Sequence, residues 1–302
     1  MRAFVRVIAA AAIATLVMGL PAGSGVAADS ANGHGRYAVT GMVLKVDPSG
    51  RRFLVSHDSV SDLMPAMAMW FDLKDPSELK GVTPGAIVEF VLAVGPTSAR
   101  AERIRVRQYV NVEQDPLAAR RLRLMKEATG PGSAVSALAV GQAVPDFSLL
   151  DQARQTVTLS QLRGRVIAVN FIYTSCVLPQ FCFRMANHFS VLQKRFKASL
   201  GRDLLLLTVT FDPVRDQPER LAEYASQWKA DPHVWHFLTG APSDLQRVCS
   251  LFGVDAFPDE GLLTHTTRTA VIDRRGVLRA SVEGNEFTAV QLGDLVQAAL
   301  KE

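Results

Sequence analysis

Short stretches in which apolar and polar residues alternate follow one another between residues 37 and 112, separated by turn-forming residues. Alternation with a period of two is typical of half-buried β-strands, and several such strands at close spacing favour a small antiparallel barrel or sandwich. We therefore predict an all-β domain over residues 37–112. Its strands are expected within YAVTGMVLKVD, RFLVSHD, AMAMWFDL, GAIVEFVLAVG and AERIRVRQYVNV.

From residue 141 the pattern changes to strands that alternate with helices. VIAVNFIYTS and DLLLLTVTFD are apolar almost throughout, as expected for strands buried on both faces. A sheet covered by helices on both faces is predicted for residues 141–302, ending in a hairpin around RRG and a last helix, the ending of thioredoxin-like folds. The other expected elements are the helices FCFRMANHFSVLQKRFKASL, QPERLAEYASQWK and APSDLQRVCSLFG and the strand VWHFLTG.

Two segments carry neither pattern. Residues 113–140 combine a polar amphipathic stretch with TGPGSA, which predicts a linker with a short helix. Residues 1–28 begin with two arginines, continue through an apolar run and end in small residues, so we predict a secretory signal peptide cleaved after Ala28. The alternative is an uncleaved anchor in the inner membrane. Either way the chain is expected in the periplasm.

The net charge and the cysteine content narrow the classes of function and partner that the sequence allows. The formal charge is +4, and two of these charges belong to Arg2 and Arg6 of the predicted signal. This balance gives no reason to expect a nucleic acid or an anionic membrane as partner. Three cysteines in 302 residues are too few for a disulfide framework, so the closely spaced pair Cys176 and Cys182 needs a chemical explanation.

Cys176 follows a predicted buried strand, and Cys182 lies near the start of the next helix. Open α/β sheets bind their ligands at this edge, and a helix N-terminus lowers the pKa of a thiol. Three interpretations stay open: a structural disulfide, a redox pair in a thiol-disulfide oxidoreductase or thiol peroxidase, and two soft metal ligands. So short a loop makes the first less favourable, because closing it restricts the unfolded chain only slightly.

Three segments, FIYTSCVLPQFC, TFDPVRDQPERLAEYA and THTTRTAVIDRRG, resemble in order and position the Sco/SenC family of thioredoxin-like copper proteins. The resemblance implies copper ligands at Cys176, Cys182 and His265 and a role in supplying copper to cytochrome c oxidase. Thiolates suit Cu(I), and an added imidazole keeps Cu(II) accessible. The family usually places three residues between its cysteines, whereas five intervene here.

Other polar residues of this domain receive structural interpretations. Asp216 is expected to be an N-cap, with Pro218 and Glu219 in the first helical turn. Asp212 is a candidate carboxylate beside the metal. A core or surface position is expected for His188, a core position for Cys249, and opposite faces of a strand for His233 and His236.

The predicted β-domain contains a second candidate metal site. Met67 and Met69 lie on one face of an expected strand, and His57 ends the preceding one. Thioethers select Cu(I) or Ag(I), although methionines also fill apolar cores. The stretch resembles the CusF-like periplasmic copper-binding domain, an OB-like barrel, which implies His57, Met67 and Met69 as ligands. Met64 stands where that family has a tryptophan, and Trp70 is expected to face the other way.

Together these features predict a periplasmic copper chaperone with an OB-like β-barrel followed by a thioredoxin-like α/β domain. Copper would pass by ligand exchange between the two domains and on to an acceptor protein, for which a cytochrome c oxidase subunit is one candidate. Because the thiols must be reduced before they bind copper, a periplasmic thiol reductant is a further expected partner. The enzyme alternative uses Cys176 as nucleophile and Cys182 to resolve it; a structural exported protein with a simple bridge is the third class.

Overall fold

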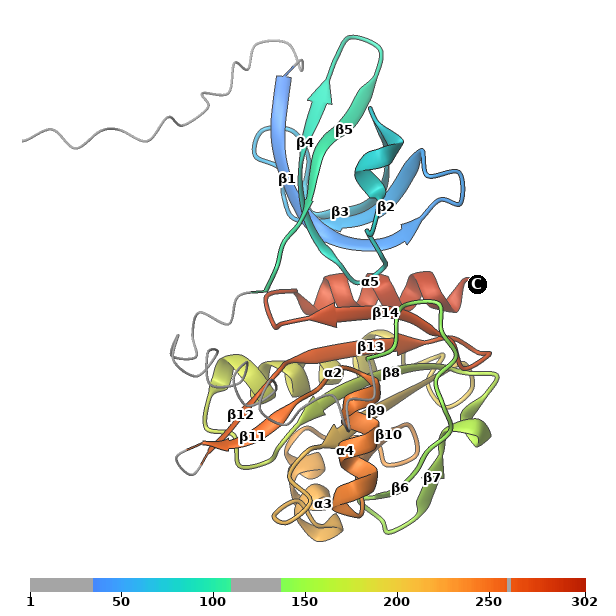
Figure 1. The fold of residues 1–302 in the computed structure, drawn as a ribbon, viewed down its shortest axis with the longest axis vertical. Helices are drawn as coiled ribbons and strands as arrows, with labels where there is room; N and C mark the ends of the chain where they lie inside the picture. Colours follow the sequence, from blue (N-terminus) through green and yellow to red (C-terminus); the bar gives the residue numbers. More distant parts are fainter. Residues whose placement is uncertain (1–34, 110–136, 260–261) are drawn as a thin grey trace, which may run out of the picture.

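The computed structural model describes residues 35–109, 137–259 and 262–302 (Figure 1). The predicted signal peptide and most of the predicted linker lie outside these ranges. Within them, no helix is long and apolar enough to cross a membrane.

The first domain is one five-stranded antiparallel sheet in the order β3-β2-β1-β4-β5, which confirms the predicted all-β fold. The outer strands approach each other where the main-chain N–H of Lys74 donates to Ala101 O at 3.0 Å, so the sheet curls toward a barrel. Alternation places Phe53, Phe71 and Phe90 inside, with ring centroids 4.9 to 6.1 Å apart. The elements are β1 (Gly35–Val46), β2 (Arg52–His57), β3 (Met67–Asp72), the 3₁₀ turn η1 (Pro76–Leu79), β4 (Ile87–Val94) and β5 (Ala99–Val106).

The second domain contains a seven-stranded mixed sheet in the order β14-β13-β8-β9-β10-β6-β7. Its centre is parallel, and both β8 and β9 are buried along their whole length, as their apolar sequences predicted. The hairpins β6–β7 and β11–β12 were not anticipated. The strands are β6 (Ser148–Asp151), β7 (Thr156–Thr158), β8 (Val166–Ile172), β9 (Leu204–Thr210), β10 (Trp235–Thr239), β11 (Ala256–Asp259), β12 (Leu262–His265), β13 (Arg268–Ile272) and β14 (Leu278–Glu283).

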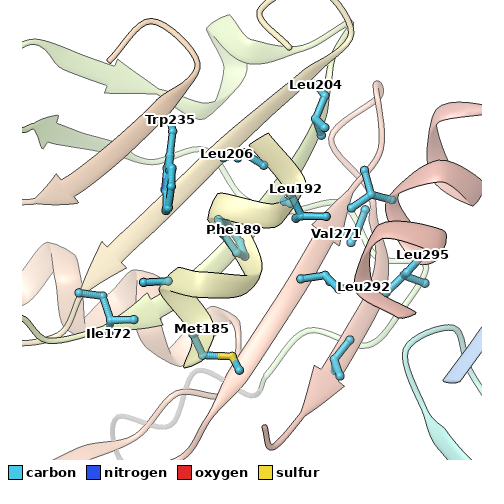
Figure 2. Packing of buried hydrophobic residues seen from close by; sticks show 14 of the residues in the cluster. Ile172, Met185, Phe189, Leu192, Leu204, Leu206, Trp235, Val271, Leu292 and Leu295 are labelled. Carbon is cyan, nitrogen blue, oxygen red and sulfur yellow. The ribbon is translucent and has the colours of Figure 1, made fainter. Parts of the chain in front are cut away.

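Helices cover both faces of this sheet. On one face α2, α3 and α5 pack into a single apolar core, and Figure 2 shows Met185, Phe189 and Leu192 of α2 within it. On the other face α4 packs against the sheet through Leu245 and Val248. The helical elements are η2 (Leu159–Leu162), the π-helical turn η3 (Pro179–Phe183), α2 (Arg184–Arg195), α3 (Pro218–Gln227), α4 (Pro242–Leu251) and α5 (Ala289–Leu300).

The two domains are packed together through α5, which lies between the first domain and the large sheet (Figure 1). Met42 and Leu44 of β1 are buried in the same apolar core as Leu292 and Leu295 of α5. Polar contacts flank this core: Ser56 Oγ donates to Asp294 at 2.7 Å, and Lys45 pairs with Glu302 at 3.1 Å. The chain therefore presents both candidate sites on one continuous packed unit.

The close approach of the two domains also explains why residue 85 is a glycine. Gly85, in the turn before β4, has φ +93° and lies against the main chain of Ser281 on β14. A Cβ at this position would stand 2.6 Å from Ser281 O, and its φ is one that L-residues rarely adopt. Any larger residue here would force the domains apart.

Candidate metal centres

The cysteine pair lies on the loop between β8 and α2. Cys176 is half-buried, and its N–H donates to Tyr173 O at 3.3 Å in a turn that follows the strand. Cys182 is buried in the π-helical turn that leads into α2. A π turn takes up more residues than an α turn, and such turns are frequent at functional sites. This wider turn accommodates the five residues between the cysteines.

Neither thiol is in a disulfide, and the two are hydrogen-bonded to each other. A hydrogen bond from Cys182 is the largest influence on Cys176 and lowers its pKa to about 6, against the opposing effect of burial. The hydroxyl of Tyr173 adds a smaller stabilisation of the same thiolate. Conversely, the interaction with Cys176 and burial raise the pKa of Cys182. These opposite shifts favour the thiolate on Cys176 and the proton on Cys182.

The sequence predicted a thiolate on one of the pair without indicating which, and the enzyme alternative named Cys176 as the nucleophile. The helix N-terminus was the expected cause, and the residue nearest to it is Cys182. The activated thiol is Cys176, in the loop, and the largest cause is its sulfur partner. Spacing alone does not reveal which of two neighbouring thiols is the more buried.

His265 ends β12 and is 4% exposed. Its Nδ1 donates to Thr266 O at 3.1 Å, and because a carbonyl only accepts, Nε2 keeps its lone pair. Burial lowers the pKa of this imidazole, so the ring is neutral at physiological pH. Neutral imidazole with a free Nε2 is the form that binds metals.

Aromatic side chains surround His265 and connect it to the cysteine loop. The ring of Tyr173 lies 5.8 Å away between centroids and that of Phe181 6.2 Å away, while Phe211 lies at 4.6 Å. Phe181 directly precedes Cys182, and the hydroxyl of Tyr173 interacts with Cys176. In the described ranges, however, no three His, Cys, Asp or Glu side chains converge as a metal-binding group. The three-residue ligand set therefore stays a prediction.

Asp216 has a different role from the one expected. The N-cap of α3 is Gln217, with Pro218 in the first turn as predicted. Asp216 is fully buried and accepts from the N–H and hydroxyl of Thr174 and from the hydroxyl of Thr210. It thus fastens the chain two residues before Cys176, and burial raises its pKa. Asp212 forms an ion pair with Arg215 at 3.1 Å.

His188 and the third cysteine lie as the sequence indicated, whereas His233 and His236 do not lie on opposite faces of one strand, because His233 precedes β10. His188 is buried against Phe287, with ring centroids 5.1 Å apart, and burial lowers its pKa to about 4. Cys249 is buried in the core beneath α4, which raises its pKa to about 12. His236 is paired with Asp151 at 3.1 Å, whereas His233 is exposed before β10.

In the first domain, strand register brings the predicted ligands to one face. His57 is directly opposite Met67, and Met69 is opposite Val55 two pairs further along, on the same face of the sheet. His57 is 1% exposed and Met67 47%, so the face runs from the interior to the surface. His57 Nδ1 donates to Asp58 O at 2.7 Å, while the buried Nε2 has no hydrogen-bond partner. An unpaired ring nitrogen beside two thioethers fits a soft cation such as Cu(I).

Trp70 and Met64 are two further residues close in sequence to this candidate site. Trp70 pairs with Leu54 on the opposite face of the sheet, as predicted, and the guanidinium of Arg52 lies 4.8 Å from its ring centroid. Met64 packs against the interior of the first domain and is bridged to Val60. Its role as a further thioether ligand stays a prediction.

Comparison with known proteins matches each of the two domains to a family model. The SCO1/SenC family model matches residues 136–300, more than half of the chain, which therefore belongs to this family. The model described as copper binding periplasmic protein CusF matches residues 36–106. Both resemblances predicted from the sequence are confirmed.

Individual relatives match the second domain. The SCO1 protein homolog of Bacillus subtilis is 33% identical over 97 residues, covering 32% of this chain and 49% of the relative. Protein sco1 of Schizosaccharomyces pombe is 25% identical over 138 residues, covering 43% of this chain and 51% of the relative. The chain thus spans about half the length of these two curated relatives. The crystal structure of Arabidopsis thaliana ScoI with copper bound is 22% identical, covers 54% of this chain and 100% of its own, and has a TM-score of 0.47.

Copper is the metal common to these findings. It appears in the description of the CusF model and in the name of a relative from Stutzerimonas stutzeri, a "putative copper-binding protein" that is 30% identical over 146 residues, covering 47% of this chain and 69% of the relative. The expectation of copper is thereby confirmed for the two families.

Proposed function

We propose that this chain is an exported copper chaperone in which the first domain binds Cu(I) through His57, Met67 and Met69. The observation that supports this site is the register that aligns the three side chains around an unpaired, buried imidazole nitrogen. Thioether and imidazole ligands prefer Cu(I) to hard cations. The first domain would therefore capture the monovalent ion.

The second domain holds copper through Cys176, Cys182 and His265 in this proposal. The single observation that carries it is the thiol pair, in which Cys182 lowers the pKa of Cys176 to about 6. One sulfur is then a ready ligand at neutral pH, and the metal displaces the proton of the other. A movement of the β11–β12 hairpin would bring His265 to the pair; Tyr173 and Phe181 contact its ring and lie on the segment that carries the cysteines.

Copper would then move by ligand exchange from thioethers to thiolates and on to an acceptor. The two domains are packed together, so capture and transfer take place in one unit. An oxidase subunit is the acceptor suggested by the family, and a periplasmic thiol donor keeps Cys176 and Cys182 reduced. The periplasm is the proposed compartment, in keeping with the description of the CusF model.

Titration with Cu(I) against a chromogenic chelator tests the proposal. The reduced protein should bind two equivalents tightly, one lost on Met67→Leu with Met69→Leu and the other on Cys176→Ser with Cys182→Ser. Tight binding of only one equivalent, or of less, would exclude the two-site function. The leucine pair is conservative because it keeps the apolar volume of the methionines.

A thiol peroxidase or thiol-disulfide oxidoreductase is the second candidate, favoured by the same lowered pKa of Cys176 and by the adjacent resolving thiol. In this case peroxide or disulfide turnover would be rapid and would survive His265→Ala. The copper function predicts instead that this variant loses metal affinity and that turnover is slow in the wild type.

A further inference from the structure

One short segment touches both halves of the proposed thiolate site. Gly284 and Asn285 follow β14, and Gly284 N donates to Thr267 O at 2.9 Å, two residues beyond His265. On the other side, Asn285 Nδ2 donates to the carbonyl of Gln180 at 2.7 Å, within the loop between the cysteines. The segment is therefore hydrogen-bonded to the histidine side and to the cysteine side of the site.

A second hydrogen bond joins Asn285 to the start of α2. Arg184, at the start of α2, donates from Nη1 to the carbonyl of Asn285 at 3.1 Å. Gln180 and Arg184 flank Cys182 in sequence. Asn285 is therefore hydrogen-bonded to the chain both before and after Cys182. The π-helical turn is thus held at both ends by one residue of the β14–α5 connection.

The segment is itself fixed in place. Asn285 is 3% exposed, so its amide would be costly to leave without a partner. Gly284 has φ +81°, and a Cβ there would overlap the ring of Tyr109. Glycine is required at this position, and the side chain of Asn285, which follows it, points at the cysteine loop.

We propose that Asn285 is a positioning residue that sets the cysteine loop against the segment carrying His265. The inference rests on the proposed copper site in the second domain. The loop has five residues between its ligands, and a loop of this length fluctuates unless it is tethered. The amide of Asn285 provides this tether at the middle of the loop, where a neutral donor is needed to meet a carbonyl.

Asn285→Asp is the sharpest test, because it keeps the shape of the side chain but replaces the donor with an acceptor that repels Gln180 O. We expect Cu(I) affinity at the thiolate site to fall by about 10- to 100-fold, the usual range for residues that orient metal ligands. Measurements use the full chain with Met67→Leu and Met69→Leu, so that only the second site is read. Arg184→Gln, at an exposed position, is a second variant in case Asn285→Asp folds poorly. It should also weaken Cu(I) binding.

Gln180→Ala is the matched control, because Gln180 takes part through its main-chain carbonyl, which the substitution keeps. It should leave Cu(I) affinity unchanged. The absorption bands of the Cu(II) form should shift in Asn285→Asp and not in Gln180→Ala. Loss of thermal stability with unchanged affinity and bands would show a purely structural role and overturn the inference.

A metal-free measurement separates this inference from the function on which it rests. Amide hydrogen exchange at residues 177–183 should accelerate in Asn285→Asp and Arg184→Gln but not in Gln180→Ala. Failure of the unsubstituted chain to bind Cu(I) at its thiols would refute the proposed function. Unchanged loop exchange in Asn285→Asp would refute the tether, whatever the metal does.

Discussion

The ring of Tyr173 lies edge-on against the imidazole of His265, with centroids 5.8 Å apart and planes at 82°. Its hydroxyl interacts with Cys176 and with the main chain of Leu263, two residues before the histidine. Tyr173 therefore connects a proposed sulfur ligand to the strand that carries the proposed nitrogen ligand. Burial raises the pKa of this phenol, so it stays a donor at every physiological pH.

The first prediction concerns the reactivity of the thiols. The alkylation rate of Cys176 should rise with pH and reach half its maximum near pH 6, the pKa set by the hydrogen bond from Cys182. Cys182→Ala removes this donor, so the pKa should move back toward its ordinary value and the rate at pH 7 should fall about tenfold or more. Tyr173→Phe should have a smaller effect in the same direction.

Mass spectrometry after brief treatment with iodoacetamide identifies the labelled residue. Cys249→Ala is the control, because that thiol is buried and its pKa is raised to about 12. Preferential labelling of Cys182 over Cys176 at pH 7 would contradict the assignment of the thiolate.

The second prediction concerns acid stability. His188 is 6% exposed, and burial lowers its pKa to about 4. The unfolded chain takes up this proton below about pH 6.5, before the folded chain does, so the free energy of unfolding should fall between pH 6.5 and pH 4. For this group the loss is about 3 kcal/mol at most.

His188→Leu should remove that part of the pH dependence, as measured by urea unfolding at pH 7 and pH 4. His265, whose pKa is also lowered, is present in both proteins and cancels in the comparison. The exposed His233→Leu is the control and should keep the wild-type dependence. Parallel pH curves for wild type and His188→Leu would show that the imidazole is not buried as described.

The third prediction concerns the packing of the two domains. Leu44 is buried in the core shared with α5, so Leu44→Asp would bury an unpaired charge or separate the domains, at a cost of about 3 kcal/mol or more. Scanning calorimetry should show one cooperative transition for the wild type and two for this variant. Val106→Asp, at an exposed position on β5, is the control. Two transitions in the wild type would mean that the shared core contributes little.

The fourth prediction separates ligands from core methionines in the first domain. With Cys176→Ser and Cys182→Ser in place, Ag(I) binding should be abolished by Met67→Leu and weakened by His57→Phe, which retains an aromatic ring beside Phe71. Met64→Leu tests the extra thioether: an unchanged affinity would limit the site to His57, Met67 and Met69. Retention of Ag(I) by the Met67→Leu variant would remove this site from the account.

Local patterns allowed much of the fold to be predicted. Alternation identified the strands of the first domain, and unbroken apolar runs identified β8 and β9, because burial on one face or on two leaves a direct trace in sequence. The hairpin β11–β12 was missed because its strands are only four residues long and carry no clear period. The packing of the domains had one available signal: α5 is apolar around most of its circumference, as a helix buried on two sides must be.

The candidate site was only partly predictable. The close spacing of Cys176 and Cys182 drew attention to that pair, whereas His265, His57, Met67 and Met69 were predicted as ligands from the two family resemblances; all six stay predictions. Tyr173 and Asn285 were not identified, since each acts through a contact between segments distant in sequence and neither belongs to a ligand type. Asp216 was misassigned as an N-cap because its position before Pro218 fits a helix start, whereas its carboxylate is buried against Thr174 and Thr210.

The central claim is that two sulfurs and one imidazole of the second domain gather around a single copper ion. X-ray absorption spectroscopy of the Cu(I) form, with Met67→Leu and Met69→Leu in place, tests it most directly. The account predicts two sulfur ligands and one nitrogen ligand, with the nitrogen lost in His265→Ala. A first coordination sphere of sulfur alone, or one unchanged by His265→Ala, would contradict it.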